Sequence, residues 1–234
     1  MQVFLGQEFK NDGDILLSPE ESKHCTKVLR HKVGDVIHII DGKGNLYRAE
    51  LSDINPQKCV ARVIEKKQIG TNKPYYLHIA ISPTKNPDRI EWLIEKGTEM
   101  GVDEFSFIIC KRTEKTGTRI DRFVKIAESA VKQSVQGVIP IINEGLVLKD
   151  FLAQQNDPSV KKYIAHCLDG NKTELKDILK EKNILVLIGP EGDFTEEEIK
   201  HAHEKGFVPL SLGESRLRTE TAGLLVAAGF TAVV

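Results

Sequence analysis

Hydrophobic and polar residues alternate over short segments in the first third of the chain. Such alternation, closed by turn residues such as Asp41-Gly42, is typical of half-buried strands joined by tight turns. Ser18-Pro19 opens one helix that we expect to reach about Leu29, because serine caps a helix and proline fits its first turn. The expected strands are residues 36–40, 46–51 and 60–64. Together these elements predict a small β-barrel over residues 1–72.

The pattern changes after a polar, breaker-rich segment at residues 66–74, which predicts a linker. From there apolar runs alternate with amphipathic segments, which indicates an α/β domain with a largely parallel sheet over residues 73–234. Gly101 is expected to stop the first helix. The expected strands are residues 76–82, 105–110, 139–142, 163–168, 184–188 and 208–212, and the expected helices are 88–100, 119–135, one beginning at Thr195, and 219–234.

Composition narrows the class of protein. The 234 residues are 40% hydrophobic and 29% charged, with a net charge of -1, as in ordinary globular proteins. A nucleic-acid partner would therefore require basic groups gathered on one face. The four cysteines form no close pair and the seven histidines are scattered, so we predict reduced thiols and no metal site. No apolar run is long enough for a membrane span, and a cytoplasmic location is expected.

The segment at residues 185–194 carries the first candidate chemistry. An apolar strand runs into Gly189-Pro190-Glu191-Gly192, and a helix follows. Ligands of open α/β sheets bind at the carboxyl ends of strands, and glycine lets the backbone approach them. The alternative is a tight turn without a ligand. The pattern is neither a dinucleotide fingerprint nor a phosphate-binding P-loop.

A second segment ends a strand at Leu212-Gly213 and leads into an apolar helix. Thr219 is expected to cap that helix, and its start, beside Arg216 and Arg218, would attract an anion. The alternative is a capped core helix with two solvated arginines. Because the helix is apolar almost all round, it is expected to be buried in this domain or in a dimer interface.

Several motifs in a fixed order carry a resemblance. Gly-Pro-Glu-Gly-x-Phe at residues 189–194 and Leu-Arg-Thr-Glu-Thr-Ala at 217–222 resemble the SPOUT methyltransferases. More narrowly, the chain resembles the RsmE family, the 16S rRNA (uracil-N3) methyltransferases, over nearly its whole length. The further matching segments are His24 with residues 28–30, Gly34-Asp35, residues 89–92, 96–101 and 128–130, and Gln133-Ser134.

The resemblance implies a function. A PUA-like RNA-binding barrel (1–72) would precede a SPOUT methyltransferase domain (73–234) with a trefoil knot at about 185–225. The chain would form a homodimer through that domain and methylate N3 of a specific uridine in the 16S rRNA of the 30S subunit. S-adenosylmethionine would be the methyl donor. Its expected binding residues are Leu187, Ile188, Gly189, Pro190, Glu191, Gly192, Leu212, Gly213, Leu217, Arg218, Thr219 and Thr221.

Catalysis at uracil N3 needs a proton acceptor and stabilisation of negative charge on the ring oxygens. Arg218 is the candidate for the second task, while Glu191 and Glu220 are candidates for the first. Glu220 alternatively only favours the helix start. Residues 111–117 are expected to form a mobile loop over the substrate. The expected RNA-binding residues are Lys23, Lys27, Arg30, Lys32, Arg112 and Arg216.

The chain departs from the family pattern at a few positions. Lys132 stands where glutamate is frequent, Val135-Gln136 where Gly-Arg is frequent, and Asp193 where glycine is usual. Glu214-Ser215 replaces a common Pro-Arg pair. Two other functions stay open: a SPOUT methyltransferase acting on another RNA, and a non-catalytic RNA-binding protein.

Overall fold

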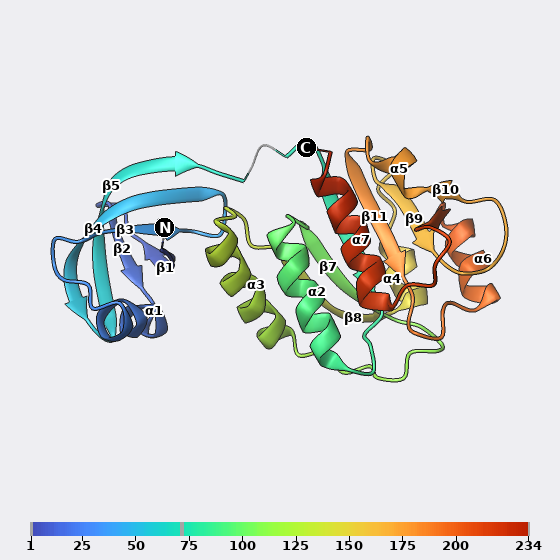
Figure 1. Ribbon diagram of the computed structural model, residues 1–234, viewed down its shortest axis with the longest axis horizontal. Helices are drawn as coiled ribbons and strands as arrows, with labels where there is room; N and C mark the ends of the chain where they lie inside the picture. The colour runs from blue at the N-terminus through green and yellow to red at the C-terminus, as the bar shows by residue number, and fades with distance from the viewer. Residues whose placement is uncertain (1, 71–72, 234) are drawn as a thin grey trace. The chain divides into compact units, whose positions relative to one another are not determined.

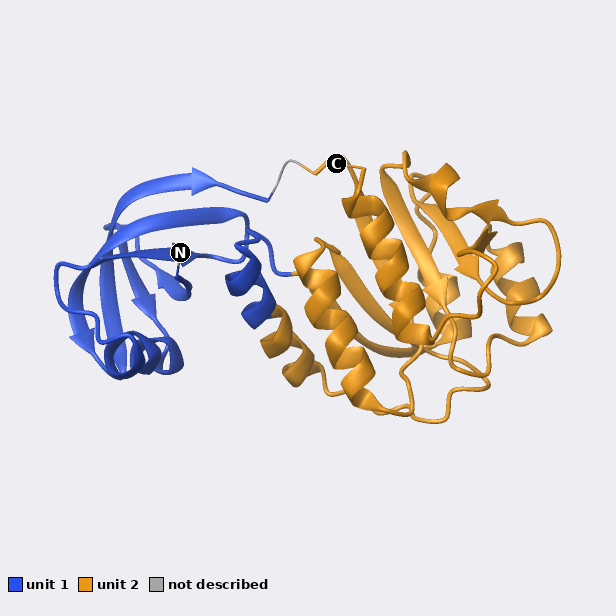
Figure 2. Ribbon diagram, in the orientation of Figure 1, with its two compact units in different colours: residues 1–72, 128–139 blue, residues 73–127, 140–234 orange. Residues whose placement is uncertain are grey.

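The computed structural model describes residues 2–70 and 73–233. They divide into two compact units (Figure 2). Unit 1 contains residues 1–72 and 128–139, and unit 2 contains residues 73–127 and 140–234. Among the described residues, none of the helices has the length and apolar character needed to cross a membrane.

Unit 1 is the expected barrel. Its closed order is β1-β2-β5-β4-β3, and alternate residues such as Ile37, Ile39, Ala49 and Leu51 fill its core. The strands are β1 (Val3–Phe9), β2 (Asp14–Leu17), β3 (Val36–Ile40), β4 (Asn45–Asn55) and β5 (Lys58–Gln68). Sequence reasoning missed β1 and β2.

The linker prediction was wrong for Lys66, Lys67 and Gln68, which continue β5 and pair with residues 45–47 of β4. Their polar side chains misled the prediction, because a strand at a barrel rim needs few apolar residues. Residues 71 and 72 of the predicted linker lie outside the described residues.

The predicted first helix is confirmed, although its interior is irregular. The α1 helix (Pro19–Lys23) starts at Ser18, whose hydroxyl accepts a hydrogen bond from the Glu21 backbone N–H at 3.2 Å. It continues as a π-helical turn, η1 (His24–Val28). Lys132, from the α3 residues that belong to unit 1, forms an ion pair with the buried Glu21 carboxylate.

Unit 2 contains a seven-stranded sheet, and every strand pair described in it is parallel. The α/β prediction is thus confirmed. The strand order of the sheet is β10-β12-β9-β11-β6-β7-β8. The strands are β6 (Tyr76–Ile81), β7 (Glu104–Ile109), β8 (Ile141–Val147), β9 (Lys161–Ala165), β10 (Thr173–Glu174), β11 (Asn183–Ile188) and β12 (Val208–Ser211). The knot implied by the resemblance stays a prediction.

Helices cover both faces of this sheet, as its apolar strands require. Leu148, Phe151 and Leu152 of α4, with Ala202 of α6, pack on one face. On the other face α2 and α7 lie side by side (Figure 1), close enough that a Cβ at Gly223 would meet Leu93 of α2 at 3.1 Å. The helices are α2 (Pro87–Glu99), α3 (Ile120–Ser134), α4 (Leu148–Gln154), α5 (Leu175–Ile178), α6 (Glu196–Glu204) and α7 (Thr219–Thr231).

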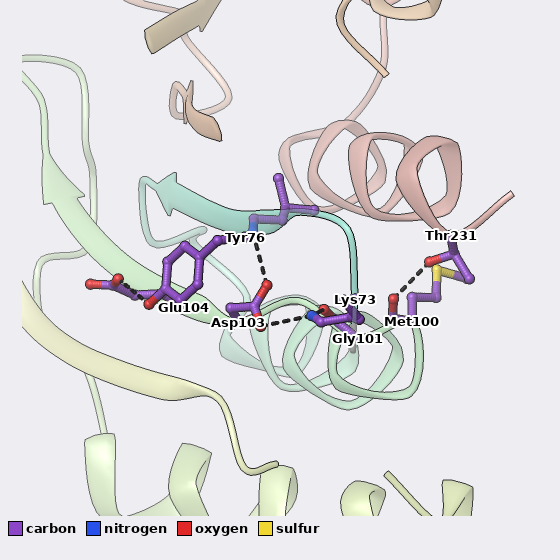
Figure 3. A network of polar contacts seen from close by, with 8 residues as sticks. Lys73, Tyr76, Met100, Gly101, Asp103, Glu104 and Thr231 are labelled. Atoms are coloured by element: carbon purple, nitrogen blue, oxygen red, sulfur yellow. Dashed lines mark hydrogen bonds and ion pairs between the residues drawn. The ribbon is translucent and has the colours of Figure 1, made fainter. Parts of the chain in front are cut away.

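One carboxylate ties the amino edge of the sheet to the end of α2 (Figure 3). Asp103 accepts hydrogen bonds from the Lys73 ammonium at 2.7 Å and from the Leu77 backbone N–H at 2.9 Å. Lys73 also donates to the carbonyl of Gly101, whose φ of 78° confirms it as the residue that ends α2. The Thr231 hydroxyl of α7 donates to the Met100 carbonyl at 2.7 Å. Strand, turn and both helices are therefore fixed together.

A second cluster of polar side chains at this edge surrounds a buried histidine. His78 Nε2 lies 2.8 Å from the Ser106 hydroxyl and 3.6 Å from Glu104. Asn143 donates to both Ser106 and Glu104, and Phe151 packs edge-on against the imidazole. Burial lowers the pKa of His78 to about 4 despite the nearby Glu104 charge. His78 is therefore neutral at pH 7.

We predict that His78 makes the fold acid-sensitive. Its pKa is about 4 in the folded chain against 6.5 ordinarily, so between these values the unfolded chain binds more protons and stability falls as pH falls. The loss is about 3 kcal/mol over that window. Urea unfolding at pH 7, 6, 5 and 4 should show a steeper decline in the wild type than in His78→Gln. His203→Gln, at an exposed position on α6, is the control; equal slopes for all three proteins would refute the prediction.

Candidate active site

The carboxyl ends of three neighbouring strands enclose a cavity of about 560 Å³ in unit 2. Because β9, β11 and β12 are parallel, the segments that follow them meet at one edge of the sheet. The lining comes from the end of each strand, the segment after it and Ala222 of α7: Ala165, His166, Cys167, Asp169 and Lys172 at β9, Ile188, Gly189, Pro190, Glu191 and Asp193 at β11, and residues 210–219 at β12. The two candidate segments of the sequence thus come together in one cavity.

The turn after β11 is held open by hydrogen bonds from its own residues and its neighbours. Asp193 has a φ of 62°, a left-handed conformation that aspartate tolerates better than most residues. Its carboxylate accepts hydrogen bonds from the backbone N–H groups of Cys167 and Phe194, at 2.7 and 2.8 Å. The Thr219 hydroxyl donates to the Gly189 carbonyl at 3.1 Å. These bonds join all three segments around the cavity.

Arg112 holds the same turn through hydrogen bonds to its backbone carbonyls. Its guanidinium donates to the Gly192 carbonyl at 2.7 Å and to the Phe194 carbonyl at 3.4 Å. A Cβ at Gly192 would lie 3.3 Å from the Arg112 side chain, so glycine allows the approach. Lys111, in the same loop, donates its backbone N–H to Glu198 at 2.7 Å. The Arg112 guanidinium is therefore occupied by the turn after β11. Lys111 and Arg112, the first two residues of the 111–117 loop, are held in place by these hydrogen bonds.

The start of α7 differs from the prediction in one respect. The N-cap residue is Arg218, whose side chain makes no capping bond, and Thr219 is the first residue of the helix. Thr219 is 5% exposed and its hydroxyl is used by Gly189, so it joins α7 to β11 rather than capping. Before it, Gly213 has a φ of 109°, which favours glycine at this position. Arg216 and Arg218 are exposed at the cavity wall.

Sequence reasoning missed the whole segment after β9, which adds Ala165, His166, Cys167, Asp169 and Lys172 to the cavity lining. His166 follows the last residue of β9, and both of its ring nitrogens are buried without a hydrogen-bond partner among the described residues. Burial lowers the pKa of His166, with a further contribution from Lys172. The neutral ring therefore offers one donor and one acceptor to whatever occupies the cavity. Its position directly after an apolar strand was the available signal, because Gly189 and Leu212 hold corresponding positions.

The predicted cofactor residues divide by position. Those that line the cavity are Ile188, Gly189, Pro190, Glu191, Leu212, Gly213, Leu217, Arg218 and Thr219. Leu187 lies instead in the core beneath the turn, fully buried. Gly192 faces Arg112, and Thr221 lines a different cavity between α2 and α7.

The two candidate carboxylates lie in different surroundings. Glu191 is exposed at the cavity formed by the strand ends, and it accepts a hydrogen bond from the Lys85 backbone N–H at 3.0 Å. Glu220 is only 6% exposed and lines the cavity between α2 and α7, with Oε1 3.6 Å from Arg89 Nε. The two side chains therefore serve different compartments, which share Arg216, Leu217 and Arg218 as a wall.

In unit 1 the predicted RNA-binding residues Lys23, Lys27, Arg30 and Lys32 are exposed along α1, η1 and the loop after them. The apolar side chains of Val28, Leu29 and Val33 are exposed in the same segment. No ion pair engages any of these four cations within the described part of the chain. Basic and apolar groups together are typical of a surface that binds nucleic acid.

Comparisons with known proteins agree with this architecture. A family model described as an RNA methyltransferase domain matches residues 71–230, and one described as an RNA methyltransferase PUA domain matches residues 17–64. A ribosomal RNA small subunit methyltransferase E of Bacillus subtilis is 29% identical over 230 residues, which cover 93% of this chain and 90% of the relative.

Solved structures agree as well. A probable rRNA-methyltransferase from Porphyromonas gingivalis has 32% identity and a TM-score of 0.90, over 100% of this chain and 99% of that one. A ribosomal RNA small subunit methyltransferase E from Neisseria gonorrhoeae, bound to S-adenosyl methionine, has 27% identity and a TM-score of 0.87, over 100% and 98%.

A parallel α/β domain with a cavity at its strand ends, in one chain with a PUA barrel, defines an RNA methyltransferase of the SPOUT class. The extent of the matches is decisive, since they span both units. Within that class, the chain belongs to the RsmE family.

Proposed function

We propose that this chain transfers the methyl group of S-adenosylmethionine to N3 of a uridine in the 16S rRNA of the 30S subunit, in the cytoplasm. The observation that carries the proposal is the 560 Å³ cavity at the carboxyl ends of β9, β11 and β12 in an RNA methyltransferase domain. The volume of this cavity falls in the range of small-molecule binding sites, and S-adenosylmethionine is a small molecule. The names of the Bacillus and Neisseria relatives, and the ligand of the latter, support the substrate and the donor.

The three strand-end segments would hold the cofactor, which when bound supplies an electrophilic methyl group on a sulfonium. Gly189 and Gly213 leave backbone amides and carbonyls accessible to its polar parts, while Ile188 and Leu217 offer apolar walls. The unpartnered nitrogens of His166 fit a ligand rich in hydrogen-bonding groups, since buried polar atoms are almost always paired in native proteins. Leu187 and Gly192 would contribute through packing.

The chemistry requires two tasks from the chain's own residues. The proton of N3–H must leave before or as the N3 lone pair takes the methyl carbon, while the C–S bond breaks with its electrons on sulfur. Arg218, exposed at the wall between the two cavities, would stabilise the negative charge that spreads onto the uracil oxygens. Glu191 and Glu220 stay the candidates for the proton, and the burial of Glu220 supports it as the stronger one.

RNA binding would use the exposed basic segment of unit 1. Lys23, Lys27, Arg30 and Lys32 would contact phosphates there, and Arg216 would do so at the cavity wall. Arg112 would act on RNA only through the turn that it supports, because its guanidinium is bound to the Gly192 carbonyl.

We also propose a homodimer through the SPOUT domain. The inner side of α7 buries Val226, Ala227 and Phe230, yet Leu225 on its outer side is 37% exposed. A second copy would remove this apolar side chain from water. Light scattering should then give twice the 26.2 kDa chain mass.

Replacing His166 should weaken cofactor binding without unfolding the protein. A lost hydrogen bond to a buried ring nitrogen corresponds to about a tenfold rise in the Kd for S-adenosylmethionine. Calorimetry on His166→Ala measures this directly and needs no RNA. The matched control is His203→Ala, exposed on α6 and outside the cavity. Equal affinities for both variants would leave His166 without a part in the site.

The reaction itself is tested with labelled S-adenosylmethionine and 30S subunits, followed by mapping of the methylated base. We expect label at N3 of one uridine. Arg218→Ala should slow transfer by about 100-fold, the usual effect of removing a group that stabilises transition-state charge, while RNA binding is retained. Lys200→Ala, at an exposed site on α6, should react as the wild type does. Label on another base or on tRNA, or no transfer at all, would contradict the proposal.

The basic segment of unit 1 is tested by salt dependence. Replacing Lys23, Lys27 and Lys32 together by alanine should reduce the slope of log K against log salt for RNA by about 2 to 3, close to one for each lost phosphate contact. Replacing three exposed lysines of unit 2 should leave the slope unchanged; Lys161, Lys176 and Lys180 are suitable. The same slope in both triple variants would reject the assignment.

A further inference from the structure

A second cavity, of about 630 Å³, lies between α2 and the start of α7. It adjoins the strand-end cavity, because Arg216, Leu217 and Arg218 line both. From α2 it receives Arg89 and Trp92, which lie three residues apart and so on one side of the helix. A ligand here would therefore lie beside the place proposed for the methyl donor.

Glu220 gives this cavity an unsatisfied acceptor. The residue is 6% exposed, and its Oε2 is buried with no hydrogen-bond partner among residues 2–70 and 73–233. Its other oxygen is 3.6 Å from Arg89 Nε, which is longer than a hydrogen bond. Leaving a buried carboxylate oxygen unpaired is costly, so a donor from a ligand is expected at Oε2.

Three of the polar side chains around the cavity, which also include Asp88 and Arg216, match one nucleobase edge. Glu220 is an acceptor, with Arg89 as a donor on α2 and Arg218 as a donor at the start of α7. The Watson–Crick edge of uracil presents the complementary order of acceptor O2, donor N3–H and acceptor O4. Cytosine presents an acceptor at N3 and an amino donor at position 4, which would oppose the carboxylate and one arginine with like groups.

Trp92 supplies the apolar surface that such a base needs. Its side chain is 42% exposed at the cavity, which is unusual for a residue of this size. Unpaired bases stack on exposed aromatic rings, because every base has a flat face that such a ring can cover. Leu217, 37% exposed, adds a second apolar side chain.

We propose that the cavity between α2 and α7 receives the unpaired target uracil, which stacks on Trp92 and is distinguished from cytosine by Glu220 together with Arg89 and Arg218. The proposal rests on the uridine reaction proposed above and adds the base-recognition residues Arg89 and Trp92. The base would enter unpaired, because Glu220 and the arginines would form hydrogen bonds with its Watson–Crick edge.

The test uses the fluorescence of Trp92, the one tryptophan in the sequence. Full-length protein, saturated with S-adenosylhomocysteine so that no reaction occurs, is titrated with an oligouridylate and with an oligocytidylate of equal length. We expect saturable quenching by oligouridylate and at least tenfold weaker binding of oligocytidylate. Equal quenching by both, or quenching by neither, overturns the proposal, and this comparison needs no variant.

Glu220→Gln sharpens the assignment. An amide can donate as well as accept, so the preference for uridylate over cytidylate should fall to about twofold or less. Calorimetry with S-adenosylhomocysteine checks that this variant keeps the cofactor site. Glu196→Gln, an exposed position on α6, should keep the full preference. A Glu220→Gln protein that binds the cofactor analogue and still prefers uridylate tenfold would show that Glu220 does not read the base.

The outcomes separate this inference from the proposed reaction. If 30S subunits gain label at uracil N3 while oligouridylate leaves Trp92 unaffected, only the base cavity is wrong. If oligouridylate quenches selectively but no uridine is methylated, the reaction is wrong and the uracil site stands.

Discussion

The parallel pairing of β9, β11 and β12 is the constraint on which the site depends. In a parallel sheet all strands end at the same edge, so segments far apart in the sequence are brought together there. Hydrogen bonds from the Cys167 backbone N–H to the Asp193 carboxylate and from the Thr219 hydroxyl to the Gly189 carbonyl then connect the three strand ends. A change in any one strand's register would move the turn that follows it, and with it that strand's share of the cavity lining.

The two cavities offer different kinds of residue to the proposed reaction. The strand-end cavity is built from glycine turns, backbone groups and one neutral histidine, which suit a ligand held in a fixed shape. The cavity between α2 and α7 has three arginines, a buried carboxylate and an exposed tryptophan, which suit a planar base with a polar edge. Arg218 belongs to both, and so a single side chain can act where donor and acceptor meet.

The sequence predicted the parts whose signal is local. The apolar run of β11, its glycine turn and the capped start of α6 at Thr195 are each recognisable from a few neighbouring residues. Prediction failed where contacts with distant residues decide the outcome. Thr219 was expected to cap α7, but its hydroxyl is taken by Gly189, thirty residues away in sequence. Likewise the place of His166 directly after β9 is the one local signal, and the burial of its ring depends on the other two segments.

Backbone geometry and charge explain two of the departures from the family pattern and oppose a third. Asp193 and Val135 stand where the family pattern often has glycine, and both have positive φ, 62° and 57°. Aspartate tolerates this conformation, and its carboxylate accepts two backbone hydrogen bonds. Asp193 therefore stabilises the turn locally. Valine gains no such bond, and its β-branched side chain is strained there. Lys132 replaces an acidic residue but pairs with the buried Glu21, which a glutamate at that position would repel. The two charges therefore depend on each other, because removing Lys132 would leave the buried Glu21 carboxylate without its partner.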